Sequence, residues 1–180
     1  IDSAIQEVIM STQFIKSGKV LDFEEKLSKY LNTNVITCAN GTDALQIAFM
    51  ALDLQPGDEV ITTPFTFIAT VETAVLMGLK PVFVDVSPID FNIDASKIEA
   101  KLTARTRGII AVSLFGQCAN FEVINDIAQR KGLWVIEDAA QSFGAIYDGK
   151  RSCSLTDVAV TSFFPAKPLG CYGDGGAVFT

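Results

Sequence analysis

The fold class of this chain is decided by the stretch RGIIAVSLFGQCANFEVINDIAQRKGLWVIED, residues 107–138. It begins and ends with apolar runs rich in Val and Ile, residues 107–115 and 133–138. The segment between them, 121–131, has the spacing of an amphipathic helix. The apolar residues are continuous rather than alternating, which is typical of strands buried on both faces. Two buried strands joined through a helix predict a parallel pair with a right-handed crossover.

The same alternation extends outward from this stretch in both directions. Further helices are predicted over residues 4–15, 22–31, 41–52, 67–77 and 95–102, and further strands over 34–39, 59–64, 80–86, 157–164 and 175–180. Asp22 is the expected N-cap of the second helix. We therefore expect an α/β fold, with a mostly parallel central sheet wrapped by helices on both faces as an α/β/α sandwich. Its 180 residues fit one domain, and we expect it to be the N-terminal part of a longer protein.

Composition excludes several classes of function. The net charge is −7 and the 14 basic residues are scattered, which disfavours nucleic-acid binding. No apolar run approaches the ~20 residues of a membrane helix. The four cysteines form no Cys-x-x-Cys pair, so we expect no metal site and reduced thiols in a cytoplasmic protein. Histidine is absent, which excludes Ser-His-Asp and Cys-His catalysis within these residues.

The segment CANGTDAL, residues 38–45, is the first candidate binding element. A strand ends at Cys38, and a helix is expected to open at Thr42 or Asp43. The backbone N–H groups at a helix start, together with the helix dipole, form a phosphate site. Gly41 allows close approach of the backbone. An ordinary capped strand-to-helix turn is the alternative interpretation.

The segment VIEDAAQSFGA, residues 135–145, supplies two carboxylates at the end of a buried strand. Adjacent strand residues point to opposite faces, so one of Glu137 and Asp138 is expected to face the site and the other to face structure or solvent. A carboxylate near the core needs a partner. The protonated ring nitrogen of a ligand would supply one, while the alternative is that Asp138 caps a helix over AAQSF.

The segment SFFPAKPLGCYGDGGAVF, residues 162–179, holds Lys167 between Pro165 and Pro168. The prolines stiffen the backbone around a flexible amine. The alternative is a surface lysine whose stem lies on apolar neighbours. Taken together, the three segments fit one ligand with a phosphate, a basic ring nitrogen and an aldehyde that reacts with lysine, which is pyridoxal 5′-phosphate.

Four motifs give the chain a family resemblance: GTDAL, TFIAT, EDAAQSFGA and SFFPAKPLGxYGDGGA. They are similar to those of the DegT/DnrJ/EryC1/StrS sugar aminotransferases, and the match runs over essentially the whole chain. The resemblance implies a pyridoxal-phosphate enzyme of the aspartate-aminotransferase fold (fold type I). Lys167 then corresponds to the lysine that bonds to the cofactor aldehyde and shuttles protons, and Asp138 to the partner of the pyridine nitrogen. Gln141 corresponds to the residue beside the phenolic oxygen of the ring.

The resemblance also assigns the remaining contacts to the cofactor. Phe67 corresponds to the aromatic residue that stacks on the ring, with Phe65 as its rival and core packing as the alternative for both. Thr42 and Asp43 correspond to the helix-start pair whose backbone binds phosphate, and Ser162 to a further phosphate ligand.

The family implies more than a cofactor. It implies amination of a keto sugar carried on a UDP or dTDP nucleotide, glutamate as amino donor, a role in surface-polysaccharide or other amino-sugar biosynthesis, and a homodimer with shared active sites. Relatives are longer, with a small C-terminal domain absent here, and many have histidine where this chain has Ser113. Because relatives that act as sugar dehydratases replace the lysine, Lys167 favours transamination. A dehydratase and a non-catalytic regulatory member are the alternatives.

Overall fold

The computed structural model describes all 180 residues, and its centre is a seven-stranded sheet in the order β1-β9-β8-β5-β4-β2-β3. Strands β2, β3, β4, β5 and β8 run parallel, and β9 is antiparallel to both of its neighbours, β8 and β1. The strands are β1 (Val35–Cys38), β2 (Glu59–Thr62), β3 (Lys80–Phe83), β4 (Thr106–Val112), β5 (Trp134–Asp138), β8 (Val158–Ser162) and β9 (Gly176–Phe179). The expected mostly parallel sheet is confirmed.

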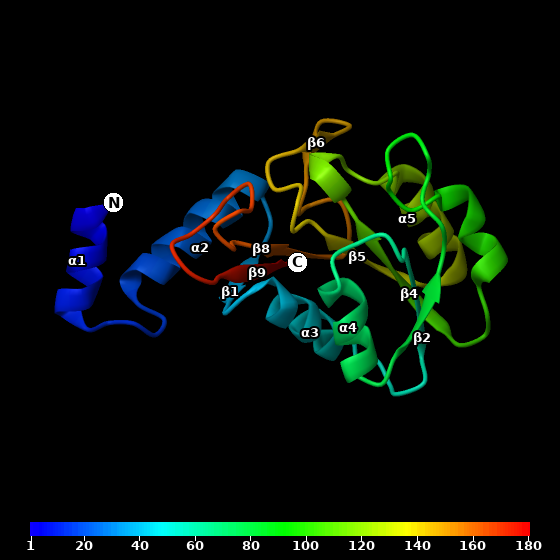
Figure 1. The fold of residues 1–180 in the computed structure, drawn as a ribbon, viewed down its shortest axis with the longest axis horizontal. Coiled ribbons are helices and arrows are strands. Elements are labelled where there is room, and N and C mark those ends of the chain that lie inside the picture. The colour runs from blue at the N-terminus through cyan, green and yellow to red at the C-terminus, as the bar shows by residue number, and fades with distance from the viewer.

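Helices cover both faces of this sheet. The helices are α1 (Asp2–Ser11), α2 (Gly18–Leu31), α3 (Gly41–Ala51), α4 (Ala69–Leu76) and α5 (Phe121–Lys131). Helices α3 and α4 lie side by side, as Figure 1 shows. They share one apolar core with the sheet. Helix α5 and helix α2 bury two further cores on the opposite face. The expected α/β/α sandwich is therefore confirmed.

The continuous apolar runs supply both of these faces at once. In β4, Ile109 and Ala111 belong to the core under α5, whereas Ile110 belongs to the core under α3 and α4. The neighbouring β5 divides in the same way. Gly108 is required where β4 meets β5, because a Cβ at this position would lie 2.3 Å from the Trp134 ring. Alternation across a doubly covered sheet explains why the sequence shows no polar side of either strand.

Three helix predictions are wrong in detail. The first helix ends at Ser11 rather than at residue 15. Helix α2 begins at Gly18 with Ser17 as N-cap, so Asp22 lies inside the helix, where it accepts a hydrogen bond from Lys26 at 2.6 Å. The segment predicted as a helix over 95–102 forms two short 3₁₀ turns, Ala95–Lys97 and Glu99–Lys101. A third 3₁₀ turn spans Leu114–Gly116, and a small hairpin is formed by β6 (Ile146–Tyr147) and β7 (Lys150–Arg151).

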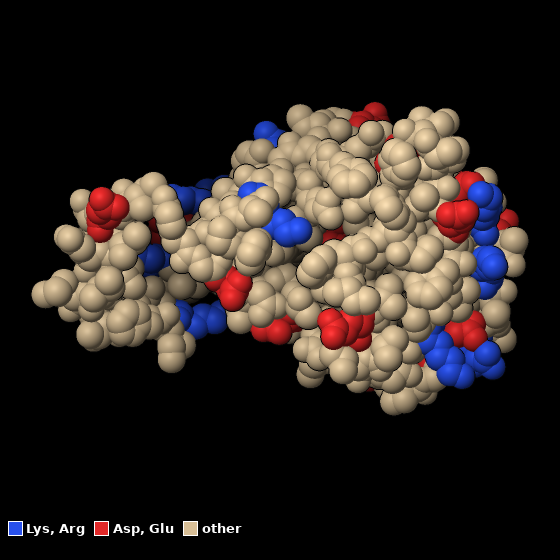
Figure 2. Space-filling view, viewed as in Figure 1, with Lys and Arg blue, Asp and Glu red and all other residues tan.

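Most of the charged side chains lie on the outer surface. Figure 2 shows Lys and Arg side chains interspersed with Asp and Glu on the face in view. Helix α1 projects from one end of the molecule, and none of its residues is buried (Figure 1). No helix combines the length and the apolar character needed to cross a bilayer.

Candidate active site

A cavity of about 610 Å³ opens at the edge of the sheet where β4, β5 and β8 end. Strand β9 starts at this same edge, since Gly176 pairs with both Cys38 and Ser162. All eight residues predicted for the site line this one cavity: Gly41, Thr42, Asp43, Phe67, Asp138, Gln141, Ser162 and Lys167.

The start of helix α3 forms one wall of the cavity. Asn40 caps the helix by accepting the Asp43 N–H at 2.8 Å, so this N–H of the predicted pair Thr42 and Asp43 is already bonded. The N–H groups of Gly41 and Thr42 have no acceptor within the helix. A Cβ on Gly41 would lie only 2.7 Å from the Cβ of Ser162. The helix start and the end of β8 therefore approach closely, and two free N–H groups and the Ser162 hydroxyl border the same space.

Asp138 lies at the base of the cavity. Ile136, two residues earlier on the same strand, and Val160, its register partner on β8, belong to the core under α3 and α4, so the Asp138 side chain faces that side of the sheet. Thr70 donates to its Oδ2 at 2.8 Å, and the Ala140 N–H donates to Oδ1 at 3.2 Å. Burial raises the pKa of Asp138, although these two bonds and the charge of Lys167 act in the opposite direction. No Lys or Arg forms an ion pair with it.

The alternative interpretation of Asp138 as a helix cap is only partly met. The bond from Ala140 is the local one expected of a capping carboxylate, but residues 140–144 form turns rather than a helix. The expectation that one of the two carboxylates faces structure is met by Glu137. This residue is fully buried on the opposite face and accepts hydrogen bonds from Ser152 and the backbone of Cys153 and Leu155.

Lys167 lies in a loop that is closed on itself. The Cys171 N–H donates to the Phe163 carbonyl and the Lys167 N–H to the Phe164 carbonyl, both at 2.8 Å. Gly170 is required in this loop because its Cβ would lie 2.4 Å from the Pro165 carbonyl oxygen. The closed loop directs a half-buried lysine into the cavity rather than into solvent.

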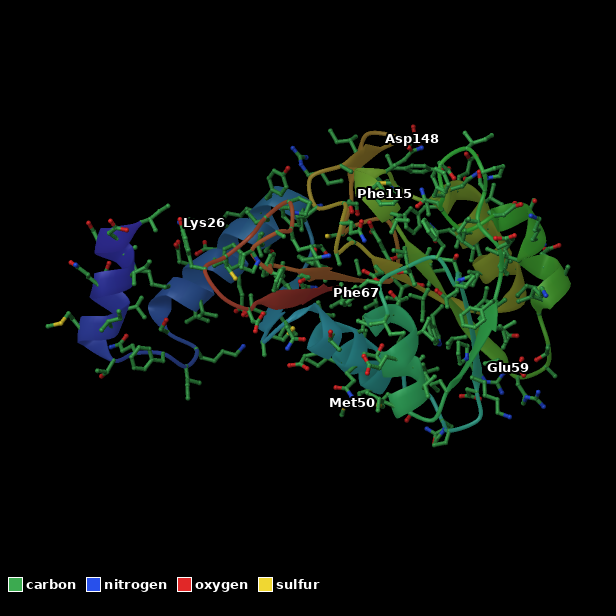
Figure 3. All side chains as sticks on the ribbon, viewed as in Figure 1. Lys26, Met50, Glu59, Phe67, Phe115 and Asp148 are labelled. Carbon is green, nitrogen blue, oxygen red and sulfur yellow. The ribbon has the colours of Figure 1, made fainter.

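The two candidate aromatic residues, Phe67 and Phe65, lie in different surroundings. The Phe67 ring lines the cavity, with the Lys167 Nζ 5.8 Å from its centroid, and Figure 3 shows it beside the start of α4. Phe65 instead packs with two other rings, at 5.9 Å from Phe91 and 6.3 Å from Phe115. Phe67 is therefore the candidate for stacking on a ring in the cavity.

Gln141 and Ser113 differ in their relation to the cavity. Gln141 accepts the Phe115 N–H through its Oε1 at 3.2 Å, which holds the amide at the cavity wall. Ser113, the position at which the family resemblance implies histidine in many relatives, is fully buried and is not part of the cavity lining. Its hydroxyl accepts the Ala119 N–H instead.

Sequence reasoning missed several residues of the cavity. Thr66 and Thr70 line it from the start of α4, and Asn40 and Asp174 line it from the loops next to α3 and β9. Both threonines belong to the TFIAT motif, so the motif itself indicated that residues other than Phe67 contribute to the site. Asn40 precedes a predicted helix and is a common capping residue, so its place at the helix start was also readable.

The donor set fits pyridoxal phosphate. A phosphate suits the two free N–H groups of α3 and the Ser162 hydroxyl. The buried Asp138 has no cationic partner, and a protonated ring nitrogen would supply one. No group of three or more Cys, Asp or Glu side chains is arranged to hold a metal ion.

Comparison with known proteins first defines the class. The structure of NtdA from Bacillus subtilis, solved with bound cofactor PMP, matches this chain with a TM-score of 0.93 and 37% identity, over 99% of this chain and 40% of that one. Solved aminotransferases match as well, so the predicted fold of the pyridoxal-phosphate aminotransferases is confirmed.

The chain belongs to the DegT/DnrJ/EryC1/StrS aminotransferase family, whose model matches residues 1–180. It is 58% identical to the UDP-2-acetamido-2-deoxy-3-oxo-D-glucuronate aminotransferase of Pseudomonas aeruginosa, over 100% of this chain and 50% of the relative. It is 49% identical to the pleiotropic regulatory protein of Geobacillus stearothermophilus, over 98% of this chain and 48% of the relative. The chain thus spans about half the length of the curated relatives it matches.

Proposed function

We propose that residues 1–180 are the cofactor-binding large domain of a longer pyridoxal-phosphate-dependent aminotransferase that aminates a keto sugar carried on a nucleotide. One observation supports this above all others: an amine, a buried carboxylate and a helix start, all from distant segments, border a single cavity. The Pseudomonas aeruginosa relative is named for a UDP-linked 3-oxo uronate, and the identity of 58% favours a substrate of that class.

Each residue would have a distinct task. When bound, pyridoxal phosphate supplies an aldehyde that reacts with amines and a ring that withdraws electrons. Lys167 would hold the cofactor covalently through its Nζ and later move a proton with the same amine. Asp138 would keep a proton on the ring nitrogen. The contacts around them would come from the free N–H groups of Gly41 and Thr42 and the Ser162 hydroxyl for phosphate, from the Phe67 ring face, and from Gln141 beside the phenolic oxygen.

The other parts of the proposal come from the family. Glutamate is the proposed amino donor, the cytoplasm the proposed location, and surface-polysaccharide or other amino-sugar synthesis the proposed pathway. The proposed assembly is a homodimer with shared active sites. Exposed apolar side chains on the outer side of α3 and α4, which include Met50, Ile68 and Leu76, support the dimer because a second copy would cover them.

A non-catalytic regulatory role is the second candidate, because the Geobacillus stearothermophilus relative is named as a regulatory protein. A regulator that had lost catalysis would have no need of the reactive groups. This chain keeps both Lys167 and Asp138, and both line the cavity, which favours the aminotransferase. The presence of Lys167 likewise favours transamination over dehydration.

The test uses the full-length protein. We expect the purified protein to be yellow with pyridoxal phosphate, and borohydride to fix the cofactor on the peptide that contains Lys167. A Lys167→Ala variant is the matched control and should retain no cofactor after reduction. Incubation with glutamate and UDP-linked 3-keto sugars should yield the amino sugar. A wild-type protein that takes up no cofactor would disprove the proposal.

A further inference from the structure

Two hydroxyl groups connect the cavity to the buried carboxylate of Asp138. The Thr66 Oγ1 lies 3.0 Å from the Thr70 Oγ1, and Thr70 donates to Asp138 Oδ2 at 2.8 Å. Thr70 is 1% exposed, so no bulk water replaces its bond. Thr66 lines the cavity, so the hydrogen-bonded series Thr66–Thr70–Asp138 begins at the cavity wall.

The proposed pairing with a cationic ring needs Asp138 in its ionised form, and that form fixes the direction of the two hydroxyl hydrogen bonds. A carboxylate only accepts hydrogen bonds, so the single hydrogen of the Thr70 hydroxyl points to Asp138. Thr66 must then donate to Thr70. Asp138 has one other donor, the Ala140 N–H on Oδ1, so Thr70 supplies one of only two protein hydrogen bonds that it accepts.

We propose that Thr70 is a positioning residue that orients the Asp138 carboxylate and keeps it ionised for pairing with the cationic ring nitrogen of a pyridoxal-type cofactor. This inference rests on the proposed function. Ala140 fixes one oxygen from the strand end, and Thr70 fixes the other from α4, so the plane of the carboxylate is set by two separate elements.

The charged groups around Asp138 do not keep its carboxylate ionised by themselves. The ionisable groups near Asp138 or on the cavity wall are Lys167 in the loop after β8, Glu137 on β5, Cys153, Asp43 on α3 and Asp174 before β9. Of these, only Lys167 is cationic and favours the carboxylate. Burial outweighs it and raises the pKa of Asp138. Loss of the Thr70 bond would therefore raise this pKa further and neutralise the carboxylate at a higher pH.

The test measures binding of pyridoxamine 5′-phosphate to the cofactor-free full-length protein by calorimetry. This probe has no aldehyde and forms no bond with Lys167, so its affinity reports the ring and phosphate contacts. We expect Thr70→Val to weaken binding about tenfold or more, as for loss of a hydrogen bond to a charged group. We also expect its affinity to fall with acid from a higher pH than in the wild type. Thr70→Ser should restore both properties.

Thr73→Val is the matched control. Thr73 lies on the same helix, is fully buried and donates only to the Ala69 carbonyl at 2.7 Å. It should bind the probe with wild-type affinity and pH profile. A folded Thr70→Val protein with an unchanged affinity and pH profile would overturn the inference, while the proposed function would stand. If the wild type itself binds no probe, the proposed function fails with it.

A second variant covers the case in which Thr70→Val does not fold. Thr66→Ala leaves the buried threonine in place and removes only the donor to it, so circular dichroism should be that of the wild type. We expect a smaller loss of affinity, about twofold to fivefold, in the same direction and with the same shift of the pH profile. An unchanged affinity and pH profile in this variant would count against the inference.

Discussion

Glu137 and Asp138 are neighbours in the sequence but serve two different regions of the molecule. Both are buried at the end of β5 and neither forms an ion pair. Asp138 borders the cavity and has two donors, one from α4 and one from its own turn. Glu137 lies on the other face, enclosed by three donors from the segment 152–155. The strand thus directs one carboxylate to the cavity and the other to the protein interior.

The difference shows that burial alone does not identify a site. Burial raises the pKa of both carboxyl groups, and that of Glu137 to about 7. Only Asp138 borders an open space in which a cationic ligand could compensate its charge. Glu137 instead joins strand β5 to the segment after the β6–β7 hairpin, where Ser152 is also hydrogen-bonded to Ser142 at 2.7 Å.

The largest difference between the two carboxylates is expected for the substitution Asp138→Asn. We expect the variant to fold and to lose about 10²–10³-fold in amination rate, because a neutral amide does not hold a proton on a ring nitrogen. Turnover of glutamate and keto sugar by the full-length protein measures the loss. The neighbouring Glu137→Gln is the matched control and should stay within about threefold of wild type. Near-normal turnover of Asp138→Asn would remove Asp138 from its assigned role.

The same Glu137→Gln variant tests whether the burial of Glu137 makes the stability of the protein depend on pH. The folded pKa of Glu137 is raised to about 7, so the neutral form favours folding and stability falls as pH rises toward 7. We expect the wild type to lose about 2–3 kcal/mol from this group between about pH 5 and about pH 8. The glutamine has no charge to bury. Its NH₂ group can donate to the Ser152 hydroxyl, while its carbonyl oxygen accepts from the N–H groups of Cys153 and Leu155.

Chemical denaturation of the cofactor-free protein at several pH values measures this effect. The 180 residues contain no histidine, so within them few other groups titrate in this range. A glutamine variant whose stability falls with pH as steeply as that of the wild type would show that Glu137 does not control the slope.

The smallest effect is expected from Ser152→Ala, which removes one donor to Glu137. The bond at 2.6 Å favours the ionised carboxyl, so its loss should cost about 1–2 kcal/mol of unfolding free energy at pH 8 and less at pH 5. Ser154→Ala is the control, since that hydroxyl donates only to the Arg151 carbonyl near the surface. An equal loss of unfolding free energy at both pH values would show that Ser152 does not stabilise the ionised form of Glu137. The affinity for pyridoxamine 5′-phosphate should not change in either variant.

Much of the site was predictable because its residues lie at strand and helix ends. Apolar runs placed the ends of β5 and β8 within one or two residues, so Asp138 and the loop of Lys167 followed from the parallel fold. Residue type did not distinguish Phe67 from Phe65, because both are aromatic and two residues apart, and only the family resemblance favoured Phe67. The packing of Phe65 against Phe91 and Phe115 supplies the structural reason.

Local patterns also failed where neighbours in space decide the outcome. Asp22 precedes an apolar helical run, yet α2 starts at Gly18. The segment 95–102 has helical spacing but folds as two 3₁₀ turns. The bond between Thr70 and Asp138 joins residues 68 positions apart, and no spacing rule reveals it.

The order of residues along the chain was enough to determine a parallel sheet, its covering helices and the presence of an amine, a carboxylate and a helix start at strand ends. This is possible because hydrophobic periodicity is a local property that survives in one dimension. The tertiary structure alone decided which carboxylate meets the cavity, which aromatic ring borders it and which hydroxyl holds Asp138. Those choices depend on side chains brought together from distant segments, and their contact energies exist only once the sheet and its helices have packed.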